Sequence, residues 1–262
     1  MPSEVSSQGQ LDVKPGAASF DVLGVPVSVT TLDRASAAIH AWADDGRGRF
    51  VCIRDVHGIV QAVDDPRLAA LHREAAMVTP DGMPLVWIGQ RAGLPVERTC
   101  GPELMDRVMA QSPASGLRHY FFGGRPGIAE RLKSSFERRY PGVAVVGVET
   151  PPFRELADDE LSDLAARIAC SAADVVWIGL PTPRQEFLMQ RLAPRTGVTL
   201  IGVGAAFDFH TGAVRRAPPW MQKSGLEFLF RLASDPRRLW RRYLIKAPRF
   251  VWMIATRRGE VM

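Results

Sequence analysis

An aspartate stands between a proline and a glycine in the segment Thr79-Pro80-Asp81-Gly82. The strand-like run Met77–Thr79 precedes it, so the carboxylate is expected at the carboxyl end of a strand. Open parallel sheets bind their ligands beyond those ends, and a carboxylate fixed there can act as a general base. The same residues also suit an Asp-Gly turn followed by a helix N-cap, and the segment taken alone favours this structural interpretation.

Two glycine-rich segments follow other apolar runs, at Phe122–Gly127 and Gly202–Gly212. In the first, Gly123 and Gly124 precede a predicted helix, where backbone N–H groups can approach a phosphate. It matches neither Gly-x-Gly-x-x-Gly nor the phosphate-binding P-loop, so a tight turn without a ligand explains it equally well. In the second, Gly204 allows the backbone to approach a ligand, and Asp208 could bind a hydroxyl or cap the loop.

The segment Pro181–Glu186 joins a predicted strand to a predicted helix. Pro183 suits the first turn of a helix. Arg184 and Gln185 would then lie at the positive end of that helix, where they could bind an anion and the edge of a sugar or base. Capping of the helix accounts for the same residues.

Several kinds of site are excluded by the residues that are missing. No Asp-x-Asp pair is available to hold a divalent metal beside a nucleotide diphosphate, and the five histidines form no i, i+4 ligand pair. No Gly-x-Ser-x-Gly segment predicts a serine hydrolase. The three cysteines lack Cys-x-x-Cys spacing, which indicates neither a zinc site nor a disulfide scaffold and favours a reducing, cytosolic protein.

Short apolar runs alternate with amphipathic ones through most of the chain, which predicts βαβ units and a parallel sheet. The predicted fold class is therefore α/β, with a Rossmann-like parallel-sheet core, helices on both faces and a helical basic C-terminal appendage. We expect a flexible N-terminal arm at residues 1–18, the core at 19–211 and the appendage at 212–262. Asp158 is predicted to cap the helix that starts there, and Thr31 or Asp33 to cap the first helix.

Charge is distributed unevenly. The net charge of +5 divides into −4 for the first 211 residues and +9 for the remainder, which holds 12 Lys and Arg against 3 Asp and Glu. A basic segment of this kind indicates an anionic partner: nucleic acid, a membrane surface or phosphate groups. A hydrophobic content of 46% excludes wholesale disorder, while no run of about 18 apolar residues predicts a membrane-spanning helix. No secretory signal is visible at the N-terminus.

The appendage also carries aromatic residues beside its arginines. On a predicted helix from Pro236 to Ile245, one face holds Leu239, Trp240, Tyr243 and Leu244, and the other holds four arginines. This pattern fits an anchor at a membrane interface, and packing of the apolar face on the core explains it equally well.

At these strand ends the chain resembles the WecB/TagA/CpsF bacterial glycosyltransferases. The resemblance runs in order over roughly residues 20–255, in these blocks: Asp65-Pro66 through Pro84, Arg98 with Gly101–Met105, Phe121–Gly127, Pro151–Phe153, Pro183–Glu186, Gly202–Gly212, Arg216–Pro218, Gly225–Glu227, Arg231-Leu232 and Arg237–Tyr243.

The resemblance implies an inverting transfer from a UDP-sugar to a polyprenyl-diphosphate-linked sugar at the cytoplasmic face of the membrane, without metal or cofactor. It makes Asp81 the base, places Gln185 in the pocket and assigns arginines of the appendage to the site. It also links docking of the appendage to the oligomeric state, so a homo-oligomer is an expected assembly, whereas nucleic acid is not an expected partner. The predicted substrate-binding residues are Asp55, Thr79, Gly82, Arg98, Gly123, Gly124, Arg184, Gln185, Gly204, Asp208, Arg231, Arg238 and Arg241.

The chain departs from the family pattern in three places. Ile53-Arg54-Asp55 stands where the family usually has Thr-x-Asn, which replaces a hydroxyl and an amide and is compatible with a different sugar. Arg184 stands where a lysine is usual, so the charge is kept with a different donor geometry. Phe228 replaces a usual tryptophan after Leu-Glu, which indicates a change in packing.

Two other functions use some of the same features. A nucleic-acid-binding module on a Rossmann-like body would use the basic appendage, but it leaves the strand-end motifs unexplained. A nucleotide-cofactor oxidoreductase would suit the fold class, although its Gly-x-Gly-x-x-Gly motif is missing.

Overall fold

The computed structural model describes residues 18–43, 45–218, 220–221 and 224–256. The predicted arm, except for its last residue, lies outside the described residues. The core is a six-stranded, all-parallel sheet, which confirms the predicted fold class. Its strands, in the order in which they lie side by side, are β4 (Met77–Pro80), β3 (Arg49–Arg54), β8 (Thr199–Gly202), β7 (Val175–Gly179), β5 (Arg118–Gly123) and β6 (Ala144–Glu149).

A hairpin precedes this sheet. The apolar run after residue 18 forms the antiparallel strands β1 (Ser19–Val22) and β2 (Val25–Ser28). The turn between them needs positive φ angles at Leu23 and Gly24. The side-chain hydroxyl of Ser28 accepts a hydrogen bond from the backbone N–H of Val78, which holds the hairpin against β4.

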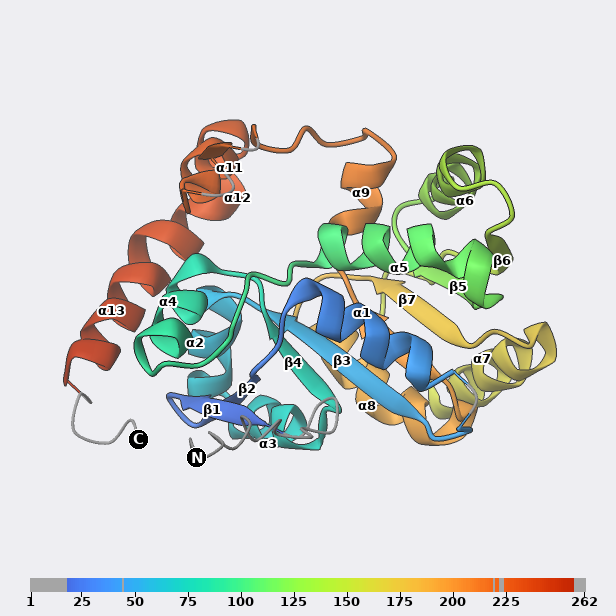
Figure 1. The fold of residues 1–262 in the computed structure, drawn as a ribbon, viewed down its shortest axis with the longest axis horizontal. Helices are drawn as coiled ribbons and strands as arrows, with labels where there is room; N and C mark the ends of the chain where they lie inside the picture. Colours follow the sequence, from blue (N-terminus) through green and yellow to red (C-terminus); the bar gives the residue numbers. More distant parts are fainter. Residues whose placement is uncertain (1–17, 44, 219, 222–223, 257–262) are drawn as a thin grey trace, which may run out of the picture.

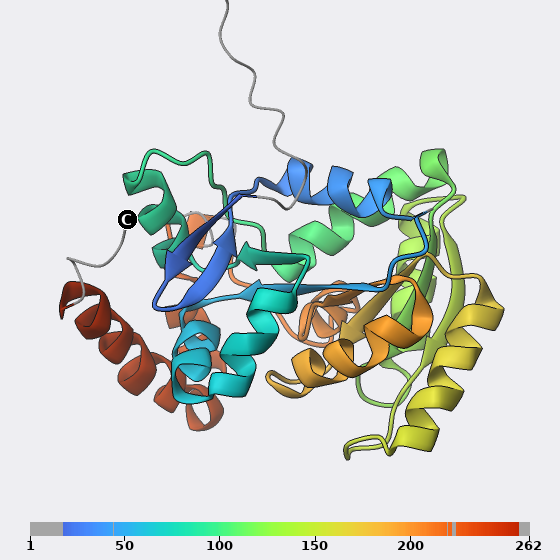
Figure 2. The same cartoon turned by 90° about the horizontal axis from the view of Figure 1, so that it is seen from below.

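Helices cover both faces of the sheet because successive residues of a strand point to opposite sides. Val51, Trp177 and Ile201 belong to the hydrophobic cluster on one face, while Cys52, Val176 and Leu200 belong to the cluster on the other. Figure 2 shows the two helical layers on either side of the strands. The layers are built by α1 (Leu32–Ala41), α5 (Gly101–Ser115) and α6 (Ile128–Arg139) on one face, and by α3 (Pro66–Glu74), α7 (Asp158–Ser171) and α8 (Arg184–Thr196) on the other.

Thr31, one of the two residues predicted to cap the first helix, is its N-cap. Its hydroxyl accepts a hydrogen bond from the Arg34 N–H. The cap predicted for α7 is wrong. Ala157 occupies the N-cap position, and Asp158 is the first helical residue. The acidic side chains at 158–160 lie in the first turn, where they interact favourably with the positive end of the helix.

The C-terminal segment forms a group of helices beside α2 (Val56–Asp64) and α4 (Met83–Arg91) (Figure 1). The short helix α9 (Ala206–His210) leads into it, and it contains α11 (Glu227–Ser234), α12 (Pro236–Trp240), the π-helix η1 (Arg241–Lys246) and α13 (Ala247–Thr256). None of the described helices is long and apolar enough to cross a membrane.

One face of the last helix packs on the core. Phe250 and Met253 are buried in a cluster that includes Ile59 and Val60 of α2. Lys246 and Arg249 form ion pairs with Asp64, at 3.3 Å and 2.6 Å. The other side retains an exposed apolar stripe, which we define as Trp240, Leu244, Ile245, Val251 and Trp252. One face of the appendage therefore packs on the core, while a different face exposes apolar side chains.

Candidate functional site

Asp81 follows β4 directly and lies at the carboxyl edge of the sheet. Its backbone N–H donates to the carbonyl of Arg54, 2.8 Å away, which continues the pairing of β4 with β3. Arg98 holds the same residue twice: Nε donates to the Asp81 carbonyl at 2.6 Å, and a terminal nitrogen donates to the carboxylate at 3.2 Å. The Asp81 side chain keeps 28% of its surface exposed, so the carboxylate is fixed and still accessible.

Arg98 also joins the core to the appendage. The nitrogen that contacts Asp81 donates to Glu227 of α11 at 2.8 Å. Glu227 in turn accepts from Arg231, one helical turn later, at 3.0 Å. The Arg231 guanidinium lies 5.1 Å from the centre of the Phe209 ring. A chain of alternating charges thus runs from Asp81 to Arg231.

Partial burial of the Asp81 carboxyl raises its pKa above the usual value for an aspartate. The guanidinium groups of Arg98 and Arg231 act in the opposite direction, while the charges of Asp55 and Glu227 add to the rise. A carboxylate with a raised pKa holds a proton more strongly, so the electrostatics of the site suit a general base.

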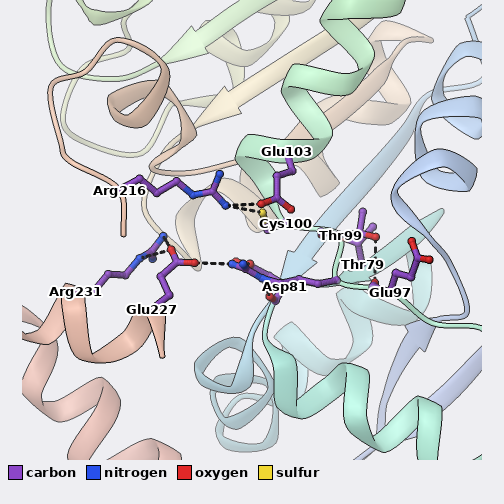
Figure 3. Close-up of polar contacts among 10 residues, drawn as sticks. Thr79, Asp81, Glu97, Thr99, Cys100, Glu103, Arg216, Glu227 and Arg231 are labelled. Carbon is purple, nitrogen blue, oxygen red and sulfur yellow. Dashed lines mark hydrogen bonds and ion pairs between the residues drawn. The ribbon is translucent and has the colours of Figure 1, made fainter. Parts of the chain in front are cut away.

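A second arginine of the C-terminal segment reaches the same edge. Arg216 donates to Glu103 in the first turn of α5 at 2.8 Å, and to the sulfur of Cys100 at 3.2 Å (Figure 3). Arg98, Arg216 and Arg231 therefore lie at the junction of core and appendage, each with a carboxylate partner. A planar guanidinium group can donate to two oxygens of one phosphate at the same time.

Three other predicted residues lie close to Asp81 in the chain or in space. Thr79 is fully buried, and its hydroxyl donates to the carbonyl of Thr99 at 2.9 Å. Asp55 caps α2 by accepting from the N–H of Gly58 at 3.0 Å. Gly82 is the N-cap of α4 and packs against Asp55, whose Cα would lie 3.6 Å from an added Cβ. The structure thus gives each of them a local structural role.

The glycines at the end of β5 are also explained by close packing. Gly123 has a φ of +138°, and a Cβ there would lie about 2.6 Å from the carbonyl oxygen of Gly179. At Gly124, with a φ of +76°, a Cβ would meet Ile128 at 2.9 Å. The backbone N–H of Gly124 donates to the Gly179 carbonyl, so that group is used within the fold.

The remaining predicted residues lie at the ends of β7 and β8. Arg184 donates to the carbonyl of Pro152 at 2.9 Å and lies over the exposed ring of Phe153. Gln185 is buried, and its side-chain oxygen accepts from the N–H of Gly204 at 3.1 Å. Asp208, in α9, forms a 3.5 Å ion pair with Arg125.

The structure does not describe the side chains of Arg238 and Arg241, so their predicted role in substrate binding stays a prediction. Glu227, Arg216 and Glu103 lie in segments that resemble the family, but the sequence pattern assigned none of them an individual role. The one local signal was the spacing of Glu227 four residues before Arg231, which allows an ion pair on one helical face. Among the described residues, no three His, Cys, Asp or Glu side chains gather as they would around a metal ion.

Comparison with known proteins adds a family to this geometry. A sequence model described as "Glycosyl transferase WecG/TagA/CpsF family" matches residues 20–260. A relative from Bacillus spizizenii is 28% identical over 217 residues, which cover 80% of each chain. It is named N-acetylglucosaminyldiphosphoundecaprenol N-acetyl-beta-D-mannosaminyltransferase. The family match includes both the strand-end segments and the appendage that meet at Arg98.

The tie between Arg98 and Glu227 makes a prediction about the appendage. In a Glu227→Gln variant, loss of the carboxylate charge should speed amide hydrogen exchange in α11 by about tenfold, because charge-assisted hydrogen bonds contribute about 1.5–3 kcal/mol. Exchange in β3 and β8 should not change. Glu130→Gln, on the exposed surface of α6, is the matched control. Unchanged exchange in α11 would mean that apolar packing alone holds the appendage in place.

Proposed function

Because the chain belongs to the WecG/TagA/CpsF family of glycosyl transferases, we propose that it moves a sugar from a UDP-sugar to a sugar carried on polyprenyl diphosphate. The transfer inverts the anomeric centre and uses no metal. The relative from Bacillus spizizenii, named for an acceptor on diphosphoundecaprenol, supports a lipid-linked acceptor. A nucleic-acid-binding module or an oxidoreductase would leave this family match unexplained.

The observation that carries the proposal is the position of Asp81 beside Arg98 and the appendage. Inversion by direct displacement needs one base on the acceptor side of the donor sugar. Asp81 would take the proton from the attacking acceptor hydroxyl, and the raised pKa of its carboxyl favours that step.

The leaving group is the other requirement. Negative charge grows on the diphosphate of UDP as the glycosidic bond breaks, and a site without metal must stabilise it with cations and N–H groups. Arg231 and Arg216 are the described appendage arginines that lie near Asp81, and the predicted Arg238 and Arg241 would add to them. Helix N-termini at the same sheet edge, such as that of α8, contribute their positive ends.

The appendage also suits work at a membrane surface. A polyprenyl chain stays in the bilayer, so its diphosphate must be reached from the surface. The apolar stripe exposes two tryptophans, which are typical of membrane interfaces. Its opposite face is held to α2, so the stripe points away from the core. We infer peripheral binding at the cytoplasmic face of the cell membrane, and a homo-oligomer stays a prediction.

The direct test is a panel of UDP-sugars with a short-chain lipid-diphosphate acceptor, read by mass spectrometry. Glucose, N-acetylmannosamine and its uronic acid are the first donors to include, since Ile53-Arg54-Asp55 departs from the usual pocket sequence. One donor should yield the disaccharide lipid, and EDTA should leave the rate unchanged. Transfer from no donor would refute the proposal, and a rate restored only by Mg²⁺ or Mn²⁺ would refute the metal-free part.

Replacing the base should separate chemistry from binding. Asp81→Asn should lower kcat by about 10²–10⁴-fold, because the amide cannot accept the proton, while UDP affinity measured by calorimetry stays near the wild-type value. In the wild type, kcat should fall as pH decreases through the raised pKa of Asp81, above the value of about 4 for an ordinary aspartate. Asp159→Asn, in the exposed first turn of α7, is the control. Unchanged turnover in Asp81→Asn would remove Asp81 from the mechanism.

The apolar stripe predicts how the protein meets lipid. Leu244→Gln combined with Trp252→Gln should weaken flotation with phosphatidylglycerol-containing vesicles by at least about tenfold, because burial of each side chain contributes about 1.5–3 kcal/mol. Val146→Gln, an exposed apolar position on β6, is the control. If the variant floats like the wild type, the stripe is not the membrane-binding surface. Salt-sensitive DNA binding without vesicle binding would favour the nucleic-acid interpretation.

A further inference from the structure

A buried ion pair lies beneath the candidate site. Arg54, the last residue of β3, contacts Glu186, in the first turn of α8. Their side chains are 2% and 0% exposed. Gly58 leaves room for the arginine, since a Cβ at that position would lie 2.7 Å from Arg54 Cδ. The pair therefore joins the carboxyl end of β3 to the helix that follows β7.

Glu186 also fixes the neighbouring amide. Its Oε1 accepts from Nε2 of Gln185 at 2.7 Å, and Oε1 of Gln185 accepts from the N–H of Gly204 at 3.1 Å. A carboxylate oxygen can only accept here and a backbone N–H can only donate, so the amide has a single favourable orientation. The described contacts give the second hydrogen on Gln185 Nε2 no acceptor within the protein, on a residue that is 3% exposed.

Arg54 reaches the candidate base through its backbone. Its carbonyl accepts from the N–H of Asp81, so the residue that ends β3 also helps to place Asp81. The Arg54 backbone therefore contacts the predicted base directly. The Arg54 side chain contacts Glu186, which in turn binds the predicted sugar-binding amide of Gln185.

Stability alone does not require this pair. Apolar side chains of similar volume often replace a buried ion pair at little or no cost in stability, whereas loss of one partner leaves an uncompensated charge. Hydrogen bonds have direction, and apolar contacts do not. Through Glu186, the charged pair adds a directional hydrogen bond to the Gln185 amide that an apolar pair would not supply.

We propose that Arg54 and Glu186 are positioning residues that hold the Gln185 side chain ready to bind a sugar hydroxyl. The inference rests on the proposed glycosyl transfer. Arg54 would act through Glu186, and Glu186 through Gln185, without either charged group touching the substrate.

The test uses the full-length protein with both charges removed, Arg54→Met and Glu186→Leu, so that no lone charge stays buried. Melting temperature should change little, while kcat should fall by about 10²-fold, because small misplacements of a substrate-binding group have effects of that size. In a Gln185→Ala background, the same double replacement should have less than about a threefold further effect. The control, Arg118→Met with Asp174→Asn, removes an ion pair at the amino-terminal ends of β5 and β7.

The side-chain amide of Gln185 gives a readout that does not depend on activity. In protein labelled with ¹⁵N-glutamine, its NMR signals should shift and broaden when the pair is removed, and the control pair should leave them unchanged. Arg54→Leu with Glu186→Met, a second apolar pair that also leaves no lone buried charge, replaces the first double variant if that one does not fold, and it should have the same effects on kcat and on these signals.

Two outcomes would overturn the inference. Unchanged kcat and unchanged Gln185 signals in a folded variant would show that the pair has no positioning role. An equal loss of kcat with and without the Gln185→Ala replacement would show that the pair acts through another group. A wild-type protein that transfers no sugar would instead refute the proposed function, and the NMR signals would still decide whether the pair orients Gln185.

Discussion

The contact of Arg98 with both Asp81 and Glu227 is the interaction on which the candidate site depends. It fixes the carboxylate that follows β4 and joins it to the first turn of α11. Arg231 is linked to the sheet edge through Glu227, which accepts hydrogen bonds from both Arg231 and Arg98. The proposed base and the proposed diphosphate-binding arginines therefore come from two parts of the chain. A contact between residues 129 positions apart joins these parts.

Much of the architecture could be predicted from local patterns. Continuous apolar runs bounded by amphipathic ones predicted a parallel sheet covered on both faces, and the structure confirms it. Thr31 was one of two expected caps, because its hydroxyl precedes a helical period. The cap at Asp158 was wrong because acids suit both the cap and the first turn, and sequence alone does not fix which position each takes.

The site was predicted in part. The structure brings Asp81, Arg98 and Arg231 together. Of the three, only Asp81 follows a parallel strand, whereas Arg98 lies between α4 and α5 and Arg231 lies in α11. Glu227, Arg216 and the Arg54–Glu186 pair were not singled out, since each depends on a partner that is distant in sequence and becomes a neighbour only through tertiary packing. The glycines at 123 and 124 look the same in sequence whether they approach a phosphate or another strand, and the structure provides the second explanation.

The most direct test of the account is a crystal structure of the protein with UDP and a short-chain acceptor analogue. Diphosphate oxygens should lie within hydrogen-bond distance of Arg231, and the acceptor hydroxyl should lie within about 3.2 Å of the Asp81 carboxylate. A nucleotide bound away from the carboxyl ends of β3, β4 and β8, with Asp81 out of reach of the acceptor, would contradict it.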